Sequence, residues 1–276
     1  MSTWFITGSS SGLGRDLARA VLDAGHNAVV TARDAESVKD LVEAHPETAL
    51  AVALDVTDSD QVASAVRAGE ERFGTVDVLV NNAGYGYRAA VEEGDETDVA
   101  TLFATNFFGP VALIKAVLPG MRARRHGAIV NISSVGARIC PAGSGYYSAS
   151  KSALEGMSGS LRKELAPLGV SVTVVEPGAF RTDFAGRSLQ QSASVIDDYA
   201  ETAGKRRKEV DTAHGTQPGD PARAAAAIVA AVEADKPPAL LMLGSDALSA
   251  IHGVFDAQLA ELSTWEATSL STDFHD

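Results

Sequence analysis

Seven short apolar runs, separated by helix-length segments, constrain the fold of this chain more than any other feature. Most runs are continuously apolar instead of alternating with polar residues, which is typical of strands that helices cover on both faces. Strand–helix–strand repetition gives right-handed crossovers and a doubly wound parallel sheet. We therefore predict an α/β fold in one domain, residues 1–276, with about seven strands near 4–7, 27–31, 49–54, 76–80, 128–132, 170–175 and 239–243.

Two segments break this rhythm. About 40 residues, 179–220, separate the sixth apolar run from the next helix, and so long an insertion is usually a lid or a substrate-binding segment. It contains a basic cluster, residues 205–208, which favours a solvated helix face over a site for an anionic substrate. After Gly244 the apolar residues keep helical spacing, so we predict a helical tail at 245–276 that packs in the core or at a subunit interface and frays beyond residue 269.

Charge and composition exclude several classes of partner. A net charge of −13 disfavours nucleic acid and anionic membrane surfaces. No continuous apolar run approaches the roughly 18 residues of a membrane span, and the chain starts directly with a strand pattern, so we expect a cytoplasmic protein. The single cysteine, Cys140, excludes an intrachain disulfide, and six scattered histidines lack metal-ligand spacing, so no metal site is predicted.

The first strand runs directly into the glycine-rich sequence Thr7-Gly-Ser-Ser-Ser-Gly-Leu-Gly14, and a helix follows. Glycines let the backbone turn tightly and approach a diphosphate, which binds at the positive N-terminus of the helix. A glycine-rich turn alone is a weak signal, but this one has the required strand–turn–helix context. We assign a dinucleotide cofactor to Gly8, Ser10, Ser11, Gly12, Leu13 and Gly14.

The residues after the second strand indicate which dinucleotide binds. An acidic residue at this strand end would accept the ribose hydroxyls of NAD(H) and repel a 2′-phosphate. Ala32 occupies the position instead, and the guanidinium of Arg33 suits a phosphate, although Asp34 weakens its field. We predict NADP(H), with NAD(H) as the alternative. Two further strand ends are expected beside the cofactor, at Asp55, Val56, Asn82, Ala83 and Gly84, although an Asn-Asn-Ala-Gly sequence could also be a simple turn.

A tyrosine and a lysine provide the candidate catalytic chemistry. Tyr147 and Lys151 are four residues apart and face each other on a helix, whereas Tyr146 would face Ser150. A cation one turn away should pull the pKa of the Tyr147 phenol down toward working pH and make it a general acid and base. Ser134, at the end of the fifth strand, could hold a substrate oxygen.

In this order and spacing the motifs resemble the short-chain dehydrogenases/reductases, in their Thr-Gly-x-x-x-Gly-x-Gly and Tyr-x-x-x-Lys subgroup. The resemblance covers about residues 3–245 and implies a Rossmann-type fold. The matching residues are Thr7, Gly8, Gly12, Leu13, Gly14, Asp55, Asn81 to Gly84, Asn106, Ser134, Tyr147, Lys151, Pro177, Gly178 and Thr182. The sequences around Tyr147 and Pro177 look most like members that act on steroids, retinoids and other apolar alcohols or ketones.

The resemblance also implies a role for each matching residue. Tyr147 would exchange a proton with the substrate oxygen, and Lys151 would lower the pKa of Tyr147 and bind the nicotinamide ribose. Ser134 would orient the carbonyl, and Asn106, which by itself could equally mark a helix kink, would support a proton relay. The nicotinamide side would be lined by Pro177, Gly178, Phe180 and Thr182.

The sequence thus predicts an oxidoreductase that transfers hydride between NADP(H) and a small, apolar carbonyl compound or secondary alcohol. An NAD(H)-dependent dehydrogenase of the same family is the first alternative. A sugar-nucleotide epimerase is disfavoured by the glycine spacing, and a silent dinucleotide sensor by the presence of Ser134, Tyr147 and Lys151. The resemblance implies a homodimer or homotetramer built on helices near 98–123 and 147–166, through Leu102, Phe103, Phe107, Leu113, Met157 and Leu161. Substrate and direction of flux stay open.

Overall fold

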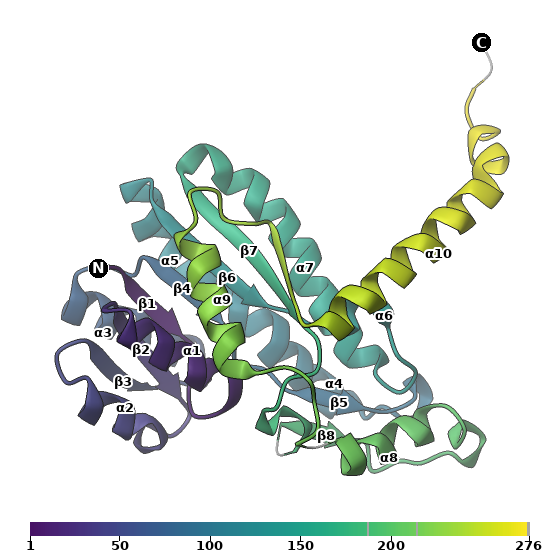
Figure 1. Cartoon of the computed structure of the whole chain (residues 1–276), viewed down its shortest axis with the longest axis horizontal. Helices are drawn as coiled ribbons and strands as arrows, with labels where there is room; N and C mark the ends of the chain where they lie inside the picture. Colours follow the sequence, from purple (N-terminus) through teal and green to yellow (C-terminus); the bar gives the residue numbers. More distant parts are fainter. Residues whose placement is uncertain (187, 214, 275–276) are drawn as a thin grey trace.

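The computed structural model describes residues 1–186, 188–213 and 215–274 (Figure 1). Two positions of the predicted lid, 187 and 214, and the last two residues of the tail lie outside the described residues. Seven parallel strands form the main sheet in the order β3-β2-β1-β4-β6-β7-β9. They are β1 Thr3–Ile6, β2 Asn27–Ala32, β3 Ala49–Ala53, β4 Val78–Asn81, β6 Gly127–Ile132, β7 Val170–Pro177 and β9 Leu240–Leu243, which confirms the predicted fold class.

Helices cover both faces of this sheet, as the continuously apolar strands require. One face packs against α1 (Gly12–Asp23), α2 (Lys39–Ala44) and α9 (Pro221–Glu233). The other packs against α3 (Ser59–Phe73), α5 (Gly109–Arg124) and α7 (Gly145–Leu165). In β1, the side chains of Trp4 and Ile6 enter the first layer and that of Phe5 enters the second, so every residue of the strand is buried.

One helix is long and apolar enough to cross a membrane, judged by its length and composition alone. The sequence contains no continuous apolar run of that length, so no such helix was expected. The helix runs continuously from Glu96 to Arg124, through α4 (Glu96–Phe103), the π-helical turn η3 (Ala104–Phe108) and α5, and its most apolar window has a mean hydropathy of 1.5. Helices in the core of a globular fold pass the same test. Here Leu113, Val117 and Met121 are buried against the sheet.

The predicted lid is tied to the body by a second, two-stranded sheet that the sequence analysis missed. In it, β5 (Gly86–Arg88) pairs in parallel with β8 (Leu189–Gln191), and α8 (Ala203–Ala213) follows. Two strands of three residues carry too little pattern to be read from sequence. The remaining short elements are η1 Ala35–Val38, η2 Val91–Glu93, α6 Gly136–Ile139, η4 Ala166–Leu168, η5 Asp183–Ala185 and η6 Asp197–Tyr199.

The tail forms one long helix, α10 (Ser245–Leu270), that projects away from the body of the molecule (Figure 1). Only its first turns are buried, at Ala247 and Ile251. Beyond these turns the apolar residues do not pack in the core of the chain, so of the two predicted places the subunit interface stays a prediction; the helix ends at Leu270, close to the predicted start of fraying. Its large exposed apolar side chains are Leu248, Phe255, Leu259, Leu262, Trp265 and Leu270.

Burial also excludes three of the residues that were predicted to form a subunit interface. Leu102, Leu113 and Leu161 are buried within the chain, because they face the sheet or the neighbouring helix. They are unavailable to a second subunit.

Candidate active site

Asn82 packs under the glycine-rich turn and fixes its shape. Its side-chain amide donates hydrogen bonds to the carbonyl oxygens of Thr7, at 2.8 Å, and Gly8, at 3.2 Å. A β-carbon at position 14 would lie 2.2 Å from the amide nitrogen of Asn82, so only glycine fits there. Gly8 and Gly12 have φ values of 69° and 56°, which glycine adopts without strain. Asn82 therefore builds the turn with its side chain.

The N-terminus of α1, directly after this turn, suits an anion. Its N-cap residue, Ser11, makes no side-chain capping bond, and the first turn has no acidic residue. By contrast, Asp58, Asp95 and Asp220 cap α3, α4 and α9 by accepting bonds from backbone N–H groups. Helix α1 thus presents N–H groups and the positive end of its dipole without a side-chain carboxylate in the way. Ser10, Ser11 and Leu13 lie in this turn, as predicted.

Arg33 lies just beyond the carboxyl end of β2, next to the glycine-rich turn. Its side chain is exposed and has no hydrogen-bond or ion-pair partner in the part of the chain that the structure describes. The neighbouring Asp34 accepts a hydrogen bond from the backbone N–H of Glu36, at 3.1 Å, and caps η1. Ala32 is buried. Among the described residues, no carboxylate therefore neutralises the Arg33 guanidinium by direct contact.

Three other predicted cofactor residues, Asp55, Val56 and Ala83, make contacts within the protein at the ends of strands. Asp55 closes a tight turn by accepting bonds from the backbone and the hydroxyl of Thr57, at 2.9 and 2.7 Å, and Val56 is buried against Gly109. The Ala83 N–H donates to the Thr7 hydroxyl, at 2.9 Å. These contacts shape the carboxyl edge of the sheet.

The loop after β7 approaches the same edge. A β-carbon at Gly12 would lie 3.3 Å from the β-carbon of Thr182, so this loop contacts the glycine-rich turn. Gly178, which follows Pro177, has no room for a side chain because the Asp246 carboxylate stands 2.4 Å from its would-be β-carbon. The ring of Phe180 packs against Gly219 and the core layer of α9. Its side chain is thus engaged in packing, and its contact with the nicotinamide stays a prediction.

Asn106 occupies the π-helical turn between α4 and α5 and is fully buried. Its amide accepts a bond from the Tyr85 N–H, at 3.1 Å, and donates to the Tyr85 carbonyl, at 2.9 Å, and to the Ser150 hydroxyl, at 3.1 Å. A β-carbon at Gly84 would lie 2.9 Å from Asn106 Oδ1 and 3.4 Å from Lys151 Nζ. The structure therefore brings Asn106, Gly84 and Lys151 together, and Asn106 lies at an irregular helix turn as well.

Lys151 is almost wholly buried, with 5% of its surface exposed. Its ammonium donates a hydrogen bond of 2.8 Å to the carbonyl oxygen of Ile132, at the end of β6. Burial lowers the pKa of Lys151 to about 8, and the negative charge of Glu155 opposes this effect.

Tyr147 and Ser134 face each other beside Gly136, whose N–H donates to the Ser134 hydroxyl at 3.0 Å. Burial raises the pKa of the Tyr147 phenol, while a hydrogen bond with Ser134 and the charge of Arg88 lower it. The expectation that Lys151 depresses this pKa is wrong for this structure. Its ammonium lies 6.0 Å from the centre of the Tyr147 ring and is bonded to Ile132, so burial dominates.

Tyr146 leaves the site, although it adjoins Tyr147. Its hydroxyl donates a bond of 2.6 Å to the Val91 carbonyl, and its ring packs edge-on against Tyr87. Ser150, one helical turn further on, uses its hydroxyl to bond to the Tyr147 carbonyl and to Asn106, and no hydrogen bond joins it to Tyr146 in the described chain.

Two residues near Tyr147 were missed from sequence. The Phe184 ring, from the lid, lies 5.9 Å from the Tyr147 ring and is 39% exposed. Arg88, from β5, is the charged group that acts on the Tyr147 phenol besides the hydrogen bond from Ser134. Phe184 follows Thr182 by two residues and could have been found as the first large apolar side chain after that motif. Arg88 has no sequence signal.

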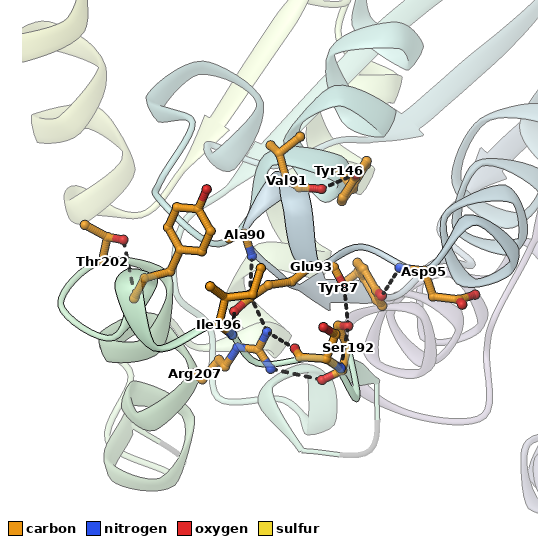
Figure 2. Close-up of polar contacts among 12 residues, drawn as sticks. Tyr87, Ala90, Val91, Glu93, Asp95, Tyr146, Ser192, Ile196, Thr202 and Arg207 are labelled. Atoms are coloured by element: carbon orange, nitrogen blue, oxygen red, sulfur yellow. Dashed lines mark hydrogen bonds and ion pairs between the residues drawn. The ribbon is translucent and has the colours of Figure 1, made fainter.

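A buried ion pair holds the lid, as Figure 2 shows. The carboxylate of Glu93 accepts bonds from the N–H groups of Ala90 and Ile196, at 2.7 and 2.9 Å, and from the Arg207 guanidinium, at 2.5 Å. Arg207 also donates to the Ser192 carbonyl, at 2.9 Å. Burial alone would raise the pKa of Glu93, but these three bonds outweigh it and hold the pKa below its ordinary value.

This contact revises the interpretation of the basic cluster. Arg207 is engaged inside the lid, so a wholly solvated face is wrong for that residue. Lys205 keeps the expected exposed position and pairs with Glu201 at 2.7 Å.

Comparisons with known proteins agree with this architecture. A family model described as short chain dehydrogenase matches residues 2–193. The oxidoreductase BOA17 of Botryotinia fuckeliana is 38% identical over 270 residues, which cover 98% of each chain. A 3-ketodihydrosphingosine reductase of Bacteroides thetaiotaomicron is 40% identical over 202 residues, which cover 71% of each chain.

Solved structures extend the likeness to three dimensions. A short-chain dehydrogenase from Streptomyces avermitilis superposes with a TM-score of 0.93 at 44% identity, over 99% of this chain and 100% of the other. A metagenomic short-chain oxidoreductase in complex with NADP superposes with a TM-score of 0.60 at 34% identity, over 65% of this chain and 83% of the other.

Proposed function

Because the chain belongs to the short-chain dehydrogenase family, and is thus an oxidoreductase by descent, we propose that it transfers hydride between NADP(H) and a carbonyl compound or secondary alcohol with a large apolar part. The observation that carries this proposal is the meeting of Ser134, Tyr147, Lys151 and Asn106 at the carboxyl edge of the sheet, where the uncapped N-terminus of α1 also lies.

The nicotinamide cofactor supplies or accepts the hydride when it is bound. The residues present fit such a group, since Gly8, Gly12 and Gly14 keep the backbone bare at the start of α1. Lys151 would bind the ribose with its ammonium, and Arg33 would pair with the adenosine 2′-phosphate. The NADP-bound relative supports the choice of NADP(H) over NAD(H), as does the absence of a carboxylate at Ala32.

The proton chemistry is assigned to Tyr147. In reduction its phenol donates a proton to the substrate oxygen, and in oxidation the phenolate accepts one. The raised pKa suits the acid, because the phenol stays protonated at neutral pH. Ser134, bonded to Tyr147, would donate its hydroxyl to the same substrate oxygen and hold it in place.

Two buried residues, Lys151 and Asn106, lie close to Tyr147 and would support this proton transfer. The Lys151 ammonium is held by Ile132, beside Asn106 and Gly84. From this position the ammonium would hold the nicotinamide ribose beside the phenol, and Asn106 fixes the helix turn that shapes this space.

An apolar substrate fits the surroundings of the phenol. The lid places the half-exposed ring of Phe184 beside Tyr147. A relative at 40% identity is named 3-ketodihydrosphingosine reductase. We therefore favour ketones with long hydrocarbon tails as the first substrates to test.

We also propose that the protein is a cytoplasmic homodimer or homotetramer. Phe108, between α4 and α5, is 60% exposed, and α7 presents the small residues Gly156 and Ser160 to solvent, which lets another helix approach closely. Light scattering at micromolar concentration tests this, and a monomer would contradict it.

The function itself is tested by following the absorbance of NADPH with a panel of ketones of increasing chain length. Turnover that rises with chain length, exceeds that with NADH and is lost in Tyr147→Phe supports the proposal. Bound NADPH without turnover of any ketone or alcohol would instead point to a silent sensor, and equal use of NADH would overturn the cofactor choice.

A further inference from the structure

Behind the catalytic serine lies a second polar cluster that the proposed reaction does not use. It joins Ser133 after β6, Arg138 of α6, Glu155 of α7 and Glu176 of β7. Glu155 follows Lys151 by one helical turn, and Ser133 precedes Ser134. The cluster therefore contacts the catalytic residues through the backbone on two sides.

One guanidinium serves two carboxylates in this cluster. Arg138 Nε donates to Glu176 Oε1 at 2.8 Å, and Arg138 Nη2 lies 3.1 Å from Glu155 Oε2. The Ser133 hydroxyl donates to Glu155 Oε1 at 2.6 Å. Two ionised carboxylates against one guanidinium would leave an uncompensated negative charge inside the fold, which is costly.

One carboxylate oxygen of this cluster lacks a hydrogen-bond donor among the described residues. Glu176 is completely buried, and its Oε2 atom has no donor in the part of the chain that the structure describes. The carboxyl group of Glu155 lies within hydrogen-bonding reach of the Glu176 carboxyl group. A proton between them would supply the missing donor and cancel the excess charge.

We propose that Glu155 and Glu176 share one proton at neutral pH and that this acid pair sets the charge that Lys151 faces. Glu155 is then a positioning residue, which acts on the reaction through Lys151. The effect on turnover rests on the proposed function, whereas the shared proton does not.

The electrostatics of the surrounding elements support this assignment. Burial raises the pKa of Glu155 to about 7; the Ser133 hydrogen bond and the Arg138 charge lower it, and the Glu176 charge raises it. On the same helix, Lys151 lies one turn before Glu155 and is the cation whose pKa the Glu155 charge raises. From α10, Asp246 instead faces Gly178 and binds the Ala179 N–H.

The charge of the pair changes close to the pH at which Lys151 would lose its proton. With the shared proton, the pair and Arg138 are neutral together; without it they carry one negative charge. The charge of Glu155 raises the pKa of Lys151 against the effect of burial. Loss of the shared proton near neutral pH therefore helps Lys151 to stay charged at higher pH.

Isotope-edited infrared spectra of the ligand-free protein with ¹³C-labelled glutamate test the shared proton. We expect the carbonyl band of one protonated glutamate at pH 6, its loss by pH 9, and its absence from both Glu155→Gln and Glu176→Gln. Glu164→Gln, on the exposed side of the same helix, should keep the band. No band at pH 6, or one that survives in both pair variants, would overturn the proposal whether or not any substrate is found.

Melting temperatures give a second readout. An acid whose pKa is raised on folding keeps its proton in the native state, so its contribution to wild-type stability falls as pH rises from about 4.5 to 7 and then levels off. Glu155→Gln lacks this loss, and its melting temperature should gain on the wild type from pH 5 to 7. A difference that does not change with pH would contradict the shared proton.

Turnover connects the pair to Lys151. With any ketone that the enzyme reduces, the alkaline limb of kcat should move to lower pH in Glu155→Gln and stay in place in Glu164→Gln. An unmoved limb in Glu155→Gln would remove the positioning role even where the infrared result holds.

Discussion

The side-chain amide of Asn82 stands where a β-carbon at position 14 would have to lie, with its nitrogen 2.2 Å from that point. The amide is fixed there by its bonds to Thr7 and Gly8, so it cannot move aside without opening the glycine-rich turn. Gly14→Ala should therefore destabilise the fold by about 1–3 kcal/mol, the usual cost of overpacking. NADPH affinity should fall as well, because the turn has to shift.

The matched control is Gly253→Ala in the projecting helix, where a β-carbon would meet nothing within 4 Å. This change should leave NADPH binding alone and raise helix stability by about 0.5–1 kcal/mol. Calorimetry and cofactor titration measure both effects. Equal responses at the two positions would show that the Asn82 contact is unimportant.

Arg33→Ala tests the choice of cofactor. Because the guanidinium is exposed and has no partner in the described chain, its removal costs the fold nothing that the structure shows. NADPH binding should weaken by about 1–3 kcal/mol, the range of a hydrogen bond to a charged group, and NADH binding should stay nearly unchanged. Arg67→Ala, exposed on α3, serves as control. Equal losses for NADPH and NADH at Arg33 would refute its pairing with the 2′-phosphate.

The two adjacent tyrosines should separate cleanly in mutagenesis. Tyr147→Phe should lower turnover by about 10²–10⁴-fold, the size of a general acid/base contribution, with cofactor affinity almost unchanged. Tyr146→Phe removes a hydrogen bond to Val91 and should cost stability of about 0.5–1.5 kcal/mol while most activity remains. Reversed effects in steady-state assays would mean that the proton donor is misassigned.

The pH dependence of reduction should reflect Lys151. Burial lowers its pKa to about 8, so the ammonium is present below that pH and is lost as the pH rises through it. The Tyr147 phenol has its pKa raised and stays protonated over this range. We expect kcat for ketone reduction to fall above about pH 8, and a rate that stays level to pH 10 would contradict the role of Lys151.

The ion pair between Glu93 and Arg207 should control the lid. Arg207→Ala leaves a buried carboxylate without its cation, a change that costs about 3–5 kcal/mol in typical buried pairs. The lid segments should then loosen, with a higher KM for the ketone and faster amide exchange near Ser192 and Ile196. Lys205→Ala, which breaks an exposed pair, should cost less than about 1 kcal/mol and leave KM unchanged. Comparable KM values in both variants would argue against a lid role for the pair.

The parallel sheet and the grouping of its strand ends at one edge followed from the continuously apolar runs, because strands covered by helices on both faces show no alternation. The sequence could not predict properties that depend on burial, such as the pKa values of Tyr147 and Lys151. The spacing of Tyr147 and Lys151 is right, but their separation is governed by the bond of Lys151 to Ile132, which only the folded chain reveals.

Long-range partners were also out of reach. Arg207 lies in a run of basic residues that looks solvated, and its carboxylate partner is Glu93, more than a hundred positions earlier in the chain. Arg88 reaches Tyr147 from a strand of three residues that exists only because the lid pairs with it. Neither contact leaves a local pattern.

The projecting helix α10 has an unexpected consequence for protease mapping. No lysine or arginine occurs after Lys236, and Lys236 is followed by proline, so trypsin finds no ready cleavage point from residue 224 to the end of the chain. Trypsin should therefore leave helix α10 uncut, within one fragment of residues 224–276, however freely the helix moves in solvent. Chymotrypsin, by contrast, finds the exposed aromatic residues Phe255 and Trp265 on α10 and should cleave this helix well before it cleaves the sheet.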